Sequence, residues 1–180
     1  MDTLLFSERS VWTMIHGIGL GGGALMALAA SLFFLRATQP PAGADSVAER
    51  QTRYLAGLTV VIAVLLWLTV LVGTYVSFPA YRASPPEGVV DLSRYPRSLI
   101  QSNPGTVWLH SFAMEIKEHV PWIAAMLATA AAFTTARYRS RLMRDAQLRG
   151  MVTRTLAICF GLVAAAALLG TFINKVAPLE

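Results

Sequence analysis

Three histidines are the residues of this sequence best suited to hold a redox-active metal, and they lie in only two of its apolar segments. His16 stands near the start of the first segment, and His110 and His119 stand near the start of the third. Imidazole is a common axial ligand of haem iron. An ionisable side chain at membrane depth is costly, so its presence points to a function.

The depth of each histidine can be counted from the arginine that ends its segment. His16 precedes Arg36 by 20 residues and His119 precedes Arg137 by 18 residues, which corresponds to roughly 30 and 27 Å of helix. His110 precedes Arg137 by 27 residues, or roughly 40 Å, which exceeds the ~30 Å of bilayer hydrocarbon. We therefore expect His16 and His119 to hold the iron of one haem b between them, with His110 outside the hydrocarbon.

Glycines and a lysine could complete such a haem site. Gly19 and Gly23 follow His16 within two turns, and glycine lets a flat macrocycle approach the backbone. The same spacing is also a helix-packing motif. Lys175 and Arg82 could neutralise haem propionates, or could serve only as interfacial anchors. On the haem interpretation, Gly19, Gly23 and Lys175 contact the cofactor.

A polar run opens the third apolar segment and allows a different metal site. Glu115 and His119 are four residues apart and share a helix face, which suits copper or iron held by carboxylate and imidazole, with His110 or His16 as a further ligand. The height count instead favours Glu115, Lys117 and Glu118 as a solvated extension of the helix.

Four apolar segments must position these residues. The chain of 180 residues is 55% hydrophobic and 14% charged, far from the charge content of a soluble domain, with mean hydropathy +0.54. The segments are long enough to cross a bilayer and predict one transmembrane domain with helices at about 11–35, 54–78, 109–136 and 151–176. The expected fold is an all-α integral membrane four-helix bundle. The single cysteine, Cys159, excludes a disulfide or c-type haem attachment within the chain.

The arginines predict the orientation of this bundle. One side holds Arg36, Arg50, Arg53, Arg137, Arg139, Arg141, Arg144, Arg149 and Arg154, and the other holds Arg9, Arg82, Arg94, Arg97, Lys117 and Lys175. Basic loops stay cytoplasmic, so both termini are expected on the outer side of a multi-pass protein in a bacterial inner membrane. The net charge of +5 is thus explained by orientation and not by nucleic-acid binding. The outer loop from Ala80 to Val107 is expected to contact partner subunits.

The arrangement resembles the small four-helix cytochrome b subunits that anchor respiratory oxidoreductases, through its architecture and through His16 with His119. The resemblance implies an electron-transfer subunit, not an enzyme by itself, that passes electrons between a quinol and an external partner. Glu118, Tyr75 or His110 could then accept quinol protons at the outer face. The alternatives are a scaffold subunit whose histidines only hydrogen-bond between helices, and the copper or iron subunit described above.

Overall fold

The computed structural model describes residues 7–37 and 45–178, and every regular element within these ranges is helical. Three of the long helices change between α and π winding along their length. The first is α1 (Glu8–Met14), η1 (Ile15–Gly22) and α2 (Gly23–Ala37), and the second is α3 (Asp45–Val72), η2 (Gly73–Ser77) and α4 (Phe78–Arg82). The third is η3 (Leu109–Met114) and α6 (Glu115–Arg137), and the fourth is α8 (Ala146–Val176). The short helices α5 (Pro96–Gln101) and α7 (Arg139–Leu142) lie in the connections.

Four helices are long and apolar enough to cross a membrane, over Glu8–Ala37, Ser46–Arg82, Leu109–Arg137 and Ala146–Val176. This confirms the expected all-α fold with four helices of membrane-spanning length. The predicted segments 54–78 and 151–176 both begin too late. The second helix starts earlier because its first turns carry polar side chains, such as the ion pair between Arg53 and Glu49 at 2.9 Å. The fourth starts at Ala146 because the Asp145 carboxylate accepts the backbone N–H of Leu148 at 3.0 Å and caps the helix.

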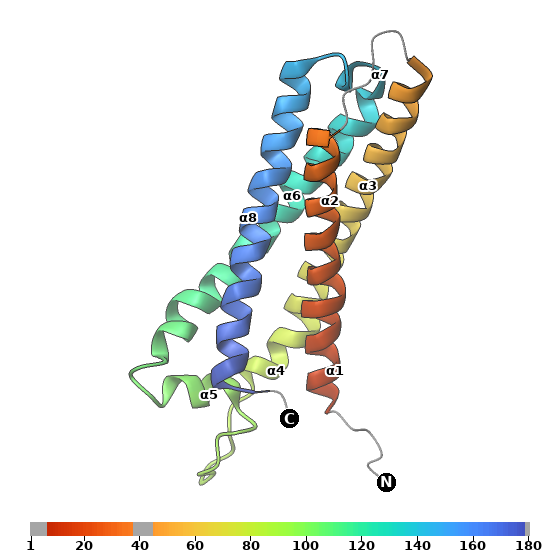
Figure 1. The fold of residues 1–180 in the computed structure, drawn as a ribbon. Coiled ribbons are helices and arrows are strands. Elements are labelled where there is room, and N and C mark those ends of the chain that lie inside the picture. The colour runs from red at the N-terminus through yellow and green to blue at the C-terminus, as the bar shows by residue number, and fades with distance from the viewer. Residues whose placement is uncertain (1–6, 38–44, 179–180) are drawn as a thin grey trace.

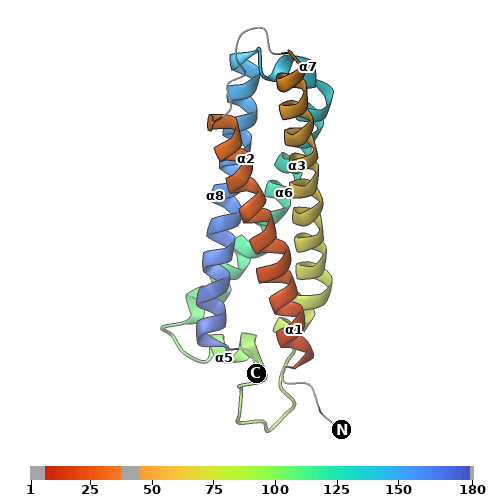
Figure 2. The same ribbon diagram turned by 45° about the vertical axis from the view of Figure 1, so that its right-hand side comes forward.

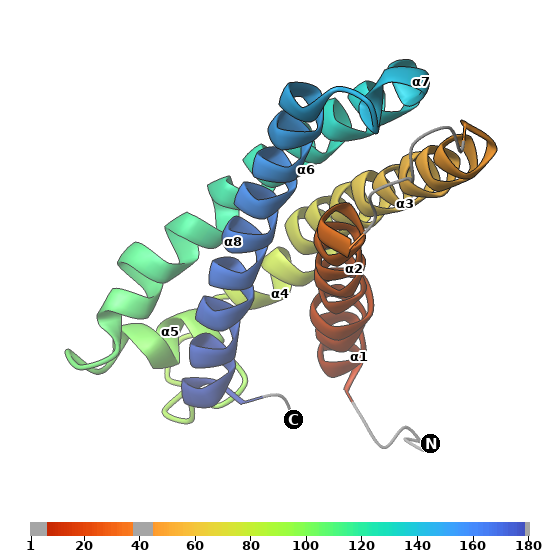
Figure 3. The ribbon, with the colours of Figure 1, turned by 45° about the horizontal axis from the view of Figure 1, so that its top comes forward.

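The long helices form an antiparallel ring. The second helix packs between the first and the third, the fourth packs between the third and the first, and consecutive helices run in opposite directions (Figures 1 and 2). Figure 3 shows α6 beside α8 and α2 beside α3. The first and third helices therefore lie diagonally across the bundle. Both described chain ends lie at one end of the bundle, called the terminal end below, and α7 lies at the opposite, arginine-rich end.

Small residues and paired polar groups hold the main core together. The face of α6 that carries Ala124, Ala128 and Ala131 is buried, so α3 and α8 can approach it closely. The hydroxyls of Thr59 and Thr135 share a buried hydrogen bond of 2.7 Å between α3 and α6. This core extends from the arginine-rich end to about the level of Ala24, Val70, Ala124 and Val163.

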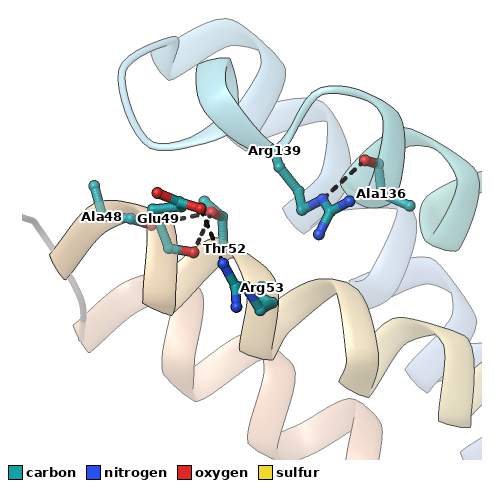
Figure 4. A network of polar contacts seen from close by, with 6 residues as sticks. All are labelled: Ala48, Glu49, Thr52, Arg53, Ala136 and Arg139. Atoms are coloured by element: carbon teal, nitrogen blue, oxygen red, sulfur yellow. Dashed lines mark hydrogen bonds and ion pairs between the residues drawn. The ribbon is translucent and has the colours of Figure 1, made fainter. Parts of the chain in front are cut away.

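Polar contacts within and beside helices organise the arginine-rich end. Thr52 donates its hydroxyl to the backbone carbonyls of Ala48 and Glu49, and Arg139 donates from Nε to the carbonyl of Ala136 at 3.2 Å. Figure 4 shows these contacts on α3 and at the junction of α6 and α7. The Arg139 contact satisfies a carbonyl in the last turn of α6, and the Thr52 contacts stay within α3.

The connection at residues 83–108 covers part of the terminal end. It turns at Gly88, whose φ of 83° is readily adopted only by glycine. Hydrogen bonds from the Ser93 backbone, at 3.0 Å, and the Ser93 side chain lower the pKa of the Asp91 carboxyl. Helix α5 then places Ile100 in a second, smaller apolar cluster with Leu109 and Ile173.

Candidate functional site

His16 lies in η1 and packs against the second long helix at Gly73. A Cβ at position 73 would lie 2.6 Å from Cε1 of His16, so only glycine leaves room for the imidazole ring there. The ring makes a hydrogen bond with the backbone of Thr69. Its Nδ1 is buried and has no hydrogen-bond partner. His16 therefore carries a ring nitrogen inside the bundle that the described residues leave unsatisfied.

Lys117 occupies a similar position on the diagonal helix. A Cβ at position 170 would lie 2.5 Å from Nζ of Lys117, so the ammonium group rests in the space that Gly170 leaves in α8. The ammonium group is largely surrounded by protein, and the residue as a whole is partly exposed. Within the described ranges, Lys117 has no ion pair and no hydrogen bond. It acts electrostatically on His16, so the two basic groups lie close enough to repel each other when both are charged.

These four residues stand at one level, which we call the basic layer: His16, Gly73, Lys117 and Gly170. His16 precedes Arg36 by 20 residues and Lys117 precedes Arg137 by 20 residues, so each stands roughly 30 Å along its helix from the arginine-rich end. The main core lies on one side of the layer. The smaller apolar cluster lies on its other side, toward the terminal end. The layer is therefore enclosed between two apolar regions.

All π-helical segments in the described part of the chain lie in this terminal half. η1 carries His16, η2 begins at Gly73, and η3 contains His110. π-Bulges are uncommon and are frequent at functional sites, because the extra residue shifts the side chains that follow it. Here the π segments change the direction of side chains on the first three long helices, near the level of the basic layer.

A second polar group lies between the basic layer and the terminal end. The Tyr81 hydroxyl and His110 Nδ1 are 3.0 Å apart, and Tyr81 is buried. Arg97 and Glu118 both act electrostatically on Tyr81. The Nε of Arg97 and the Oγ of Ser77 are buried and without a hydrogen-bond partner. This half of the bundle thus holds several polar atoms whose hydrogen-bonding capacity is unused.

The structure does not bring His119 to His16. His119 and Lys117 are two residues apart on α6 and therefore point roughly 200° apart, and Lys117 takes the inward direction. The His119 side chain is 73% exposed, and its Nδ1 lies 2.8 Å from the backbone carbonyl of Glu115. One imidazole of the expected haem pair is thus inside the bundle and the other is on its surface.

The remaining predicted residues are spread over the terminal half. A Cβ at position 23 would lie 3.6 Å from Cδ1 of Leu65 in α3, an ordinary packing distance, whereas a Cβ at position 19 would meet no atom within 4 Å. Lys175 is exposed on α8, and Arg82 stacks over the ring of Phe78. Neither Gly19 nor Lys175 contributes to the basic layer.

The structure brings together only part of the ligand set expected for a copper or iron site. Glu115 Oε2 and His119 Nδ1 are 3.8 Å apart, and both side chains are exposed. His110 is bonded to Tyr81 instead of lying beside them. Among the residues described, no three His, Cys, Asp or Glu side chains come together as a metal site.

Sequence reasoning missed the most important members of the layer. Lys117 was expected in a solvated extension, yet its ammonium group lies inside the bundle. Its equal distance from the terminal arginine was a usable signal, because it matches the count for His16. Gly73 and Gly170 were not singled out, although isolated glycines within helices at that height indicate close approach of another group.

No protein-family model, curated protein sequence or solved structure matches this chain.

Proposed function

We propose that this chain is a membrane subunit of an electron-transfer complex and that its basic layer is the site that receives quinone and quinol. The observation that carries the proposal is a pair of interior groups with unused hydrogen-bonding capacity: His16 Nδ1 is buried without a partner, and the Lys117 ammonium has no hydrogen bond or ion pair among the described residues. A buried polar group without a partner costs about 1–3 kcal/mol. A ligand that hydrogen-bonds to these groups would reduce that cost.

The chemistry of a quinone matches this layer. Its ring is flat, apolar and soluble in lipid, which suits a site enclosed between two apolar clusters. The Lys117 ammonium can donate a hydrogen bond to a quinone carbonyl, and the unpartnered Nδ1 of a neutral His16 ring can accept one from a quinol hydroxyl. Gly17 and Gly19 have no atom within 4 Å of their Cβ positions, so the first helix offers open surface beside His16 along which a ring can approach.

Oxidation of a quinol at this layer releases two protons and two electrons. Glu118, which is partly buried, and the hydrogen-bonded pair of Tyr81 and His110 lie toward the terminal end and can carry the protons to water. The two electrons pass to a redox group of a partner subunit. The loop at 83–108 covers part of the terminal end, which makes it the surface for that partner.

The haem b expected from the sequence fits these residues only in part. His16 could supply one imidazole ligand to a haem, since its Nδ1 is buried and unpartnered among the described residues. His119 does not fit the second position in this conformation because its side chain faces outward. The described residues do not complete a bis-histidine site, and no step of the proposal passes through haem.

For His110, one observation favours the alternative in which a histidine only hydrogen-bonds between helices. His110 joins η3 to α4 through Tyr81, as expected of a histidine that serves as a hydrogen-bonding link. His16 makes no such link from Nδ1. We therefore assign the link between helices to His110, beside its part in carrying protons, and the contact with the quinone to His16.

We also place the arginine-rich end in the cytoplasm and both termini outside, in a bacterial inner membrane. Support comes from the nine arginines at that end against six basic residues at the other. Cysteines introduced near Glu87 should react with an impermeant reagent in intact cells, and cysteines near Arg141 should not. The reverse pattern would move the basic layer to the cytoplasmic side.

A photoreactive quinone with an isoprenoid tail tests the site in lipid nanodiscs. We expect it to label peptides that contain His16 or Lys117, and Lys117→Met to reduce labelling about tenfold or more, the effect of ~1.4 kcal/mol. Lys175→Met is the matched control and should label like the wild type. Equal labelling of Lys117→Met would contradict the proposal. A low-spin haem spectrum that disappears in both His16→Ala and His119→Ala would replace it with the cytochrome interpretation.

A further inference from the structure

The turn that joins α6 to α8 at the arginine-rich end holds a dense basic surface. Between positions 137 and 154 the chain has six arginines and one acidic residue, Asp145. The Asp145 carboxylate is already used, since it caps α8. All nine basic residues at this end are arginines, whereas both lysines of the chain lie in the terminal half. Arginine is the side chain whose planar fork matches a phosphate in a bidentate manner.

This turn is rigidly built. Leu142 is fully buried and Met143 nearly so, which anchors α7 to the main core. The backbone N–H groups of Arg141 and Leu142 donate to the carbonyl of Tyr138 at 2.9 and 3.0 Å, and that of Asp145 donates to Arg141 at 2.8 Å. The arginines are therefore presented from a fixed backbone, so less conformational entropy is lost when they bind.

A hollow of about 680 Å³ lies at this turn, lined by Arg141, Arg144, Asp145, Ala146 and Gln147. Within the described ranges Arg141 makes no side-chain hydrogen bond or ion pair. Nearby arginines are engaged with the protein itself: Arg139 with the Ala136 carbonyl and Arg149 with the Met143 carbonyl. Arg141 thus stands at the edge of a hollow with an unused guanidinium group.

We infer that this hollow binds the phosphodiester headgroup of an anionic phospholipid in the leaflet at the arginine-rich end. The position favours a lipid, because the hollow lies between the end of one candidate membrane span, at Arg137, and the start of the next, at Ala146, where a bilayer would place its headgroups. Clusters of basic residues directly beside membrane helices attract anionic lipids by about 1 kcal/mol per side chain. The inference is independent of the quinone site at the other end.

The test uses the purified chain after delipidation, with phosphatidylglycerol or phosphatidylcholine added back. Phosphatidylglycerol should raise the melting temperature and remain bound in native mass spectrometry, and phosphatidylcholine should do neither. The double variant Arg141→Gln/Arg144→Gln should bind phosphatidylglycerol about thirtyfold more weakly, because each arginine contributes roughly fivefold. Arg82→Gln/Arg94→Gln, at the terminal end, is the matched control and should bind as the wild type does.

Two further samples separate the sources of phosphate and guard against misfolding. Inorganic phosphate alone should not stabilise the wild type; equal stabilisation would mean that a free anion is the ligand and would overturn the lipid assignment. Arg141→Lys keeps the positive charge but removes the planar guanidinium that can bind a phosphate through two hydrogen bonds. This variant should bind phosphatidylglycerol more weakly than the wild type but more tightly than the double variant. Equal phosphatidylglycerol binding by the double variant and the wild type would also overturn the inference.

Discussion

The two halves of the bundle treat their buried polar groups differently. In the half toward the arginine-rich end, Thr59 and Thr135 share a hydrogen bond between helices and Ser31 donates to the Ala27 carbonyl, and among the described residues Gln51 Oε1 alone is buried there without a partner. In the terminal half, His16 Nδ1, Ser77 Oγ and Arg97 Nε are buried without partners, and Lys117 has no counter-ion among the described residues.

The winding of the helices differs in the same way. The arginine-rich half is regular α-helix with alanine and leucine packing, whereas the terminal half contains all three π segments. Unsatisfied polar groups and irregular helices both cost stability. Both features are concentrated in the terminal half. We infer that the terminal half is adapted to bind a ligand and that the arginine-rich half supports it structurally.

The largest expected effect comes from the core of the supporting half. Leu66 of α3 is 1% exposed, so Leu66→Ala should leave a cavity and lower the free energy of unfolding by about 2–5 kcal/mol. Leu68 on the same helix is 42% exposed, and Leu68→Ala should change that free energy far less. Unfolding by denaturing detergent measures both. Equal effects would mean that this half is not a close-packed support.

Two glycines of the second helix, Gly73 and Gly57, differ in the space around them. Gly73→Ala would drive a methyl group against His16 and should destabilise the protein by about 1–3 kcal/mol. Gly57→Ala meets no atom within 4 Å and should stabilise it by up to about 1 kcal/mol, because alanine favours helix. The same unfolding measurement applies. Stabilisation by both substitutions would show that His16 does not need the space at Gly73.

The shared hydrogen bond of the supporting half should have a smaller effect. Thr59→Val or Thr135→Val should each cost about 1 kcal/mol of unfolding free energy, since the bond between them is buried. The double variant should cost less than the sum of the two single variants, which a double-mutant cycle measures. Thr171→Val, an exposed position on α8, serves as control. Strict additivity would show that the two hydroxyls do not interact.

The smallest effect concerns the loop at the terminal end. The lowered pKa of Asp91 means that its carboxylate contributes stability at neutral pH, and this contribution is lost as pH falls through the folded-state pKa. Ser93→Ala removes one of the hydrogen bonds that favour the charged form, so the pKa should rise toward its ordinary value. NMR titration of the carboxyl carbon measures the midpoint. An unchanged midpoint would assign the shift to the backbone alone.

The sequence predicted the architecture more fully than the site. Apolar segment length alone indicates four long helices, because the cost of unpaired backbone groups in lipid leaves few other solutions. The height of His16 was also accessible by counting residues. The direction of a side chain was not, since counting residues from Arg137 gives height along α6 and does not give which face of α6 turns toward the bundle. That is why height suggested a pair of His16 with His119, whereas the inward-facing residue of α6 is Lys117.

On the proposed function, the basic layer serves ligand binding and lowers the stability of the ligand-free protein. The most direct test is the free energy of unfolding of Lys117→Met in the absence of ligand. Methionine is similar in size and removes an interior ammonium group that has no counter-ion among the described residues, so the variant should be more stable than the wild type by about 1–3 kcal/mol. Destabilisation of Lys117→Met to the extent of Leu66→Ala would show that the lysine supports the fold, and would contradict the account.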